Sequence, residues 1–186
     1  MIAFEARNAW GLKDCDVGQP NLCERGCNYI RENRNRILER YDHHTSNIAR
    51  IIGRNAFVVF LMEPDFWQYY GDRREQSGNL SGPEMRTLFN DMVKMIKKNL
   101  PNAKISWDIS AWIGEGGHNT WWGFFKDSKD IDFINTSGGR MHGELAELKP
   151  GELRWSFLSQ STGKKIIADS GYGIGGGAFS KNKFCV

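Results

Sequence analysis

The sequence predicts an α/β fold with parallel strands, arranged as a partial or distorted TIM-like (β/α) barrel. One observation is the alternation of strand-like and helix-like segments, which is the rhythm of right-handed βαβ units. Another is that four apolar segments, each typical of a strand covered on both faces, end in polar groups. A complete eight-stranded barrel needs roughly 250 residues, and this chain has 186. We therefore expect residues 1–186 to form a single α/β domain with an incomplete barrel.

In the first third of the chain, the sequence pattern predicts an irregular segment, then a long helix and then a strand. Residues 1–28 contain Gly, Asn and Cys without a helical or strand period, which favours a loop segment. Apolar residues recur at helical spacing over 28–52, although His43 and His44 mark a candidate break. The continuous apolar run at 57–61 is typical of a strand in a parallel sheet.

The clearest helix follows a polar loop. Ser81 and Glu84 have the spacing of a capping box, and Pro83 suits the first turn. Apolar residues then recur at spacings of three and four up to Ile96, and residues 99–102 end the helix. The remaining expected elements are a strand at 103–107, a helix at 121–126, a strand at 131–135, a mixed segment around 155–158 and a strand at 165–168.

Charge and hydropathy exclude two classes of partner. The net charge is +3, and the basic run at 31–40 contains two glutamates, which indicates a solvated helix face rather than a nucleic-acid surface. No stretch is long and apolar enough to cross a bilayer, so we expect no membrane partner. The chain begins without a signal peptide, whereas Asn79 and Asn135 begin sequons that only a secreted protein would use. Localisation stays open, and is extracellular if a longer precursor exists.

The cysteines and glycines do not predict a cofactor. Cys15, Cys23, Cys27 and Cys185 fit no zinc-site spacing, so we predict no metal. They are consistent with two disulfides, in any of three pairings, or with free thiols. A G-x-G-x-x-G pattern occupies 171–176, but no helix is expected after it, so dinucleotide binding is not predicted.

Three strands resemble those of the glycoside hydrolase family 6 cellulases. Residues 59–65 look like the family's apolar strand ending in Glu-Pro-Asp. After the next helix, residues 100–108 are similar to its Leu-Pro-Asn strand ending in Asp, and 166–171 resemble a third family strand. Residues 13–15, Lys-Asp-Cys, are similar to the Arg-Asp-Cys loop that carries the family's catalytic acid. The resemblance covers roughly residues 55–175, in matching order.

This resemblance implies a distorted α/β barrel that hydrolyses β-1,4-glucan with inversion. In such a reaction a carboxylic acid protonates the departing oxygen while water attacks the opposite face of the sugar ring. The resemblance implies Asp14 as the acid and Asp65 as the residue that assists it. Glu63 lies across Pro64 from Asp65, and a second carboxylate nearby would raise a carboxyl pKa. The candidate catalytic residues are Asp65, Glu63, Asp108, Asp169 and Asp14.

The seven tryptophans exceed what a core of this size needs, so some should line a groove. We expect Trp121 and Trp122 to pack in the core and His118 to be a surface histidine. Aromatic rings suit the C–H faces of sugars. The candidate substrate-binding residues are Trp67, Tyr69, Tyr70, Trp107, Trp112 and Tyr172.

Two functions follow from these observations. The first is a glycoside hydrolase that acts on a cellulose-like polysaccharide or oligosaccharide. The alternative is a non-catalytic carbohydrate-binding or self-assembling structural protein on a degenerate glycosidase scaffold. The alternative is favoured by the absence of the first family strands upstream of Cys15 and by residues 109–111, which replace the family's Ala-Gly-His. Uncovered strand edges would also favour a homo-oligomer.

Overall fold

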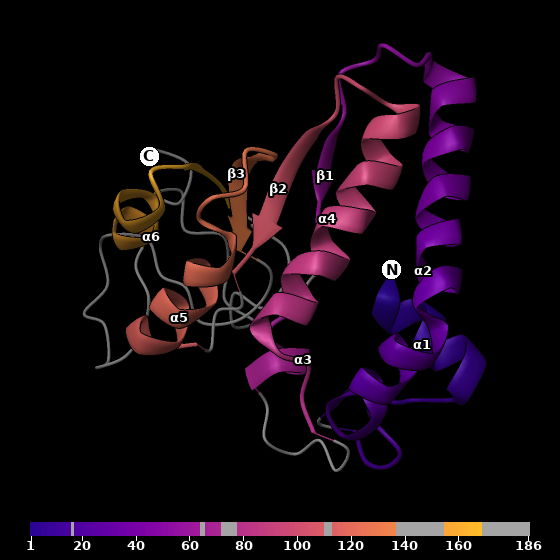
Figure 1. Ribbon diagram of the computed structural model, residues 1–186, viewed down its shortest axis with the longest axis vertical. Coiled ribbons are helices and arrows are strands. Elements are labelled where there is room, and N and C mark those ends of the chain that lie inside the picture. Colours follow the sequence, from indigo (N-terminus) through magenta and orange to yellow (C-terminus); the bar gives the residue numbers. More distant parts are fainter. Residues whose placement is uncertain (16, 64–65, 72–77, 110–112, 137–154, 169–186) are drawn as a thin grey trace, which may run out of the picture. The chain divides into compact units, whose positions relative to one another are not determined.

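The protein has a mixed α/β fold with six helices and a four-stranded parallel sheet in its described part (Figure 1). The computed structural model describes residues 1–15, 17–63, 66–71, 78–109, 113–136 and 155–168. The chain divides into two compact units. We call residues 1–59 with 67–104 the helical unit, and residues 60–66 with 105–186 the sheet unit. The predicted α/β class with parallel strands is confirmed.

Two long helices form the centre of the helical unit and lie side by side (Figure 1). Each has an apolar stripe that the other covers, which is the usual source of helix stability in water. The predicted break at His43 and His44 does not occur, and the one non-helical residue within the helix is Asn33. The elements of this unit are α1 (Ile2–Trp10), α2 (Leu22–Ile52), α3 (Gln68–Gly71) and α4 (Gly82–Asn99).

The start of α4 confirms the predicted capping box. The Glu84 backbone N–H donates to Ser81 Oγ (3.3 Å), and the Ser81 N–H donates to Glu84 Oε2 (2.7 Å). Two backbone donors that the helix leaves without partners are thereby satisfied. The hydrogen bond from the Ser81 backbone also holds the pKa of Glu84 below its ordinary value.

The prediction that residues 1–28 are irregular is wrong for most of that segment. Helix α1 spans Ile2–Trp10, and α2 begins at Leu22 with Asn21 as its cap. A hydropathy pattern does not reveal the helical period of α1, because the charged residue Glu5 lies on the buried face of the helix. The Glu5 carboxylate is 2% exposed and accepts from Arg40 Nε at 2.8 Å, with Arg36 Nε at 3.4 Å.

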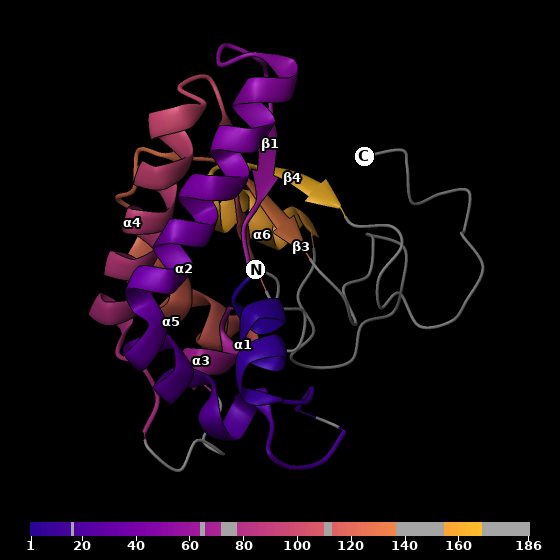
Figure 2. The ribbon, with the colours of Figure 1, turned by 90° about the vertical axis from the view of Figure 1, so that its right-hand side faces the viewer.

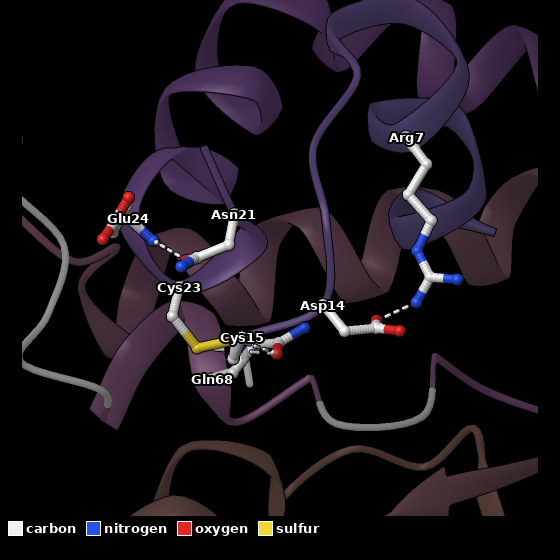
Figure 3. Close-up of a disulfide and its surroundings, with 7 residues drawn as sticks. All are labelled: Arg7, Asp14, Cys15, Asn21, Cys23, Glu24 and Gln68. Atoms are coloured by element: carbon white, nitrogen blue, oxygen red, sulfur yellow. Dashed lines mark hydrogen bonds and ion pairs between the residues drawn. A yellow bond between two sulfur atoms is a disulfide. The ribbon is translucent and has the colours of Figure 1, made fainter. Parts of the chain in front are cut away.

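A disulfide between Cys15 and Cys23 ties the loop after α1 to the first turn of α2 (Figure 3). This bond belongs to one of the pairings that the sequence left open, and Cys27 is buried and forms no disulfide with a described residue. Cys185 lies outside the described residues. The side-chain oxygen of Gln68 lies 3.3 Å from Cys15 Sγ, so α3 lies next to the disulfide.

The sheet unit contains the strand order β1-β2-β3-β4, which follows the chain order. β2 pairs with β3 and β3 with β4, both in parallel. Figure 2 shows β3 and β4 next to one another. The segment at 155–158 proves to be helical, and the helix predicted at 121–126 begins earlier. The elements are β1 (Val59–Leu61), β2 (Lys104–Asp108), α5 (Glu115–Phe125), β3 (Ile131–Thr136), α6 (Trp155–Thr162) and β4 (Lys165–Ala168), of which β1 and β2 begin in the helical unit.

Aromatic rings fill the core between β2 and α5. Trp107 is 1% exposed, and its ring centre lies 5.6 Å from that of Trp121, 5.3 Å from Trp122 and 5.0 Å from Phe125. Trp121 and Trp122 are both buried, which confirms the prediction that they pack in the core. Within the described residues, no helix is long and apolar enough to cross a membrane.

Gly26 allows α2 to approach Tyr69 closely. A Cβ atom at this position would lie 2.5 Å from Tyr69 Cε1, well inside van der Waals contact. Tyr69 is 2% exposed, and the Cys27 thiol donates to its backbone carbonyl at 3.1 Å. The ring therefore has little room to move away from a larger residue.

We expect Gly26→Ala to destabilise the protein. Alanine gains about 0.5–1 kcal/mol from helix propensity, but overpacking against Tyr69 costs about 1–3 kcal/mol, so the net loss should be about 1–2 kcal/mol. Urea unfolding measures this change. Gly123→Ala in α5 is the matched control, because nothing lies within 4 Å of its Cβ position, and it should stabilise slightly. A Gly26 variant as stable as wild type would contradict this account of the packing.

Candidate functional site

Three polar side chains form a row at the carboxyl ends of β1, β2 and β3. The β2–β3 register pairs Asp108 with Asn135. The Met62 N–H donates to the Ser106 carbonyl oxygen (3.0 Å), which in a parallel ladder makes Glu63 the neighbour of Asp108. Residues opposite one another on adjacent strands share a face and lie about 4.8 Å apart. The sheet therefore brings two carboxyl groups and an amide together on one face.

This polar row is buried. Glu63, Asp108 and Asn135 are 4%, 2% and 3% exposed. Asn135 Nδ2 donates to Asp108 Oδ1 at 2.9 Å, which fixes the orientation of that carboxylate. Asn135 Oδ1 and Ser106 Oγ are buried and have no hydrogen-bond partner in the described part of the chain. Buried polar atoms are nearly always paired, so atoms of this kind next to two carboxyl groups indicate a place for a polar ligand or water.

The other face of β2 is apolar. Side chains alternate along a strand, so Trp107 points away from Asp108 and into the aromatic core. The Trp107 ring therefore has no exposed face on which to bind a substrate, which the prediction for this residue would require.

Four further candidate residues lie in the helical unit. Asp14 is 54% exposed and forms an ion pair with Arg7 (Figure 3). Tyr69 is buried beneath α2. Trp67 and Tyr70 are half-buried, and their ring centres lie 5.1 Å apart. Of the candidates in this unit, Trp67 and Tyr70 are thus the aromatic residues with exposed surface.

Four predicted site residues lie outside the described residues, as does the G-x-G-x-x-G pattern at 171–176. They are Asp65, Asp169, Trp112 and Tyr172. Within the described residues, no group of three His, Cys, Asp or Glu side chains is placed to hold a metal ion.

The prediction that His118 is a surface residue is wrong, because it is fully buried in α5. Its Nε2 lies 3.0 Å from Ser161 Oγ, and its ring packs edge-on against Phe157. The Ser161 hydroxyl also donates to the Leu158 carbonyl oxygen (3.2 Å). The hydrogen bond between His118 and Ser161 therefore links α5 to α6 within the sheet unit.

Asn135 is the site residue that sequence reasoning missed. It follows the apolar run of β3, so its place at a strand end was visible in the sequence. Its alignment with Asp108 depends on the register between strands, which a single sequence does not contain.

No protein-family model, curated protein or solved structure matches this chain. The resemblance to glycoside hydrolase family 6 therefore stays a prediction.

Burial makes His118 a source of pH-dependent stability. Loss of hydration lowers its pKa from 6.5 to about 4. The unfolded chain therefore binds a proton more readily between these values, and stability falls as the pH drops from about 6.5 to 4. The full difference corresponds to about 3 kcal/mol.

Urea unfolding of wild type and His118→Gln at pH 7 and pH 4 tests this expectation. The variant should be less stable at pH 7 because of poorer packing, yet lose less stability on acidification. Other groups that titrate contribute equally to both proteins. An equal loss in the two would show that His118 does not carry the effect.

Proposed function

We propose that this protein is a glycoside hydrolase that acts on β-linked glucan, with Glu63 and Asp108 as its catalytic pair. The observation that supports the proposal is that both carboxyl groups are buried and that they lie opposite one another at the carboxyl ends of adjacent parallel strands. In parallel α/β folds, reactive groups collect at these strand ends. Paired carboxyl groups are the chemistry that most glycosidases use.

The contacts suggest a division of roles. Asp108 accepts a hydrogen bond from Asn135 and is thereby oriented as an acceptor, which suits the carboxylate that retaining glycosidases use as a nucleophile. Glu63 is then the acid that protonates the departing glycosidic oxygen. Neighbouring strands lie about 4.8 Å apart, which is nearer to the carboxyl separation of retaining glycosidases than to the roughly 6.5–9.5 Å that leaves room for water in inverting ones. The proposed pair therefore departs from the inversion that the family resemblance implies.

The strand order supports a partial (β/α) barrel as the scaffold. Strands that follow one another in chain order, all parallel, are the arrangement of a barrel. A doubly wound sheet would reverse the order at some point. We propose that the face carrying the polar row corresponds to the barrel interior.

A self-assembling structural protein is the second candidate. β1 is an edge strand of the described sheet, and Leu61 on it is 51% exposed. Exposed apolar edges pair readily with another strand. This candidate gains support if the folded protein releases no sugar.

Replacement of either carboxyl group should abolish most of the activity. Release of reducing sugar from soluble β-glucan is expected to fall by about 10²–10⁴-fold or more in Glu63→Gln and in Asp108→Asn, because a general acid contributes about that much and because an amide cannot replace a nucleophilic carboxylate. Asp130→Asn, at an exposed position, should keep wild-type activity.

Circular dichroism and thermal unfolding would establish that each variant is folded. The proposal fails if the folded wild type releases no sugar. It also fails if Glu63→Gln and Asp108→Asn hydrolyse glucan as fast as the Asp130 control.

A further inference from the structure

A pocket of about 320 Å³ lies wholly within the helical unit. It opens between the end of α1, the loop after it and the first part of α2. The lining residues are Trp10, Leu12, Pro20, Arg25 and Glu32.

The loop that forms one side of this pocket is held in place from several directions. The Lys13 N–H donates to the Pro20 carbonyl oxygen and the Leu22 N–H donates to the Lys13 carbonyl oxygen, both at 2.9 Å. The disulfide between Cys15 and Cys23 closes the same loop (Figure 3). A binding site whose walls are already ordered loses little entropy when a ligand binds.

One wall is aromatic and rigid. Trp10 is half-buried and packs edge-on against the buried Tyr29, with ring centres 5.3 Å apart. The Arg25 guanidinium carbon lies 6.0 Å from the centre of the Trp10 ring. Leu12, at 3% exposed, lies beneath. The guanidinium, a donor of several hydrogen bonds, lies over one face of the Trp10 ring, so the ring offers the rest of its half-buried surface to the pocket.

Two opposite charges border the pocket. Arg25 and Glu32 are exposed on α2, and neither forms an ion pair with another described residue. They are seven residues apart, so they lie on the same side of the helix and about 10 Å apart along it. A ligand in the pocket therefore meets hydrogen-bond donors at one end and acceptors at the other.

These features select the chemistry of the ligand. A ligand with a single charge would be attracted by one of these side chains and repelled by the other, and an apolar molecule would form no hydrogen bond with either. The charges of a free α-amino acid are too close together to span the helix spacing. A sugar chain is neutral, its hydroxyls both donate and accept, and its C–H faces pack on an aromatic ring.

We infer that this pocket is a carbohydrate-binding subsite that holds a short stretch of a glycan chain. The selection of a β-1,4-linked glucan as the glycan rests on the proposed function. The subsite itself is built from residues other than Glu63 and Asp108, so binding here is separable from hydrolysis.

Calorimetric titration with cellotetraose tests the inference, in an Asp108→Asn background that prevents turnover. Arg25→Gln and Glu32→Gln should each weaken binding about tenfold or more, because each removes hydrogen bonds from a charged group. Arg50→Gln and Glu39→Gln, also exposed on α2, are matched controls and should leave the affinity within about twofold of the background, since no contact with the ligand is removed.

Trp10→Ala should weaken binding at least as strongly, but it also removes the packing against Tyr29. Arg25→Gln and Glu32→Gln, which change exposed residues, are therefore the decisive variants. The inference is overturned if cellotetraose does not bind, or if Arg25→Gln and Glu32→Gln bind as the controls do. If they lose affinity while wild type hydrolyses no glucan, the subsite stands and the proposed catalytic function fails.

Discussion

The register of the parallel sheet is the constraint on which the candidate site depends. Because side chains alternate, a single register places Trp107 in the aromatic core and Asp108 beside Asn135 on the opposite face. A slip of one residue would exchange these two faces. It would bury a carboxylate among tryptophans and break the amide contact that orients Asp108. Packing on one face of β2 therefore fixes the chemistry on the other.

Local signals in the sequence were enough to predict much of the fold. The apolar runs of the strands, the spacing of Ser81 and Glu84 and the stripe of α4 each act over a few neighbouring residues. Such patterns can be recognised without knowledge of the rest of the chain. The positions of polar groups at the strand ends were predicted for the same reason.

Other features depend on contacts between distant residues. Helix α1 buries Glu5, whose charge is compensated by arginines more than thirty positions later, so a hydropathy pattern scores it as surface. Helix α5 begins at Glu115 and continues through Gly116 and Gly117, which in isolation favour a loop. The neighbours of Asn135, the burial of His118 and the choice of disulfide partner all require the folded arrangement, and none is encoded at one position.

The disulfide between Cys15 and Cys23 determines the conditions under which the helical unit reaches its final structure. Disulfides form and persist mainly in oxidising surroundings, and the loop that this one closes forms a wall of the Trp10 pocket. In a reducing medium the loop would keep its backbone bridge from Lys13 to Asn21 and the ion pair between Arg7 and Asp14, but without the covalent bond it would sample open arrangements more often. Oxidative folding thus becomes a step in the assembly of that pocket, and binding at the proposed subsite would depend on the thiol balance of the surroundings.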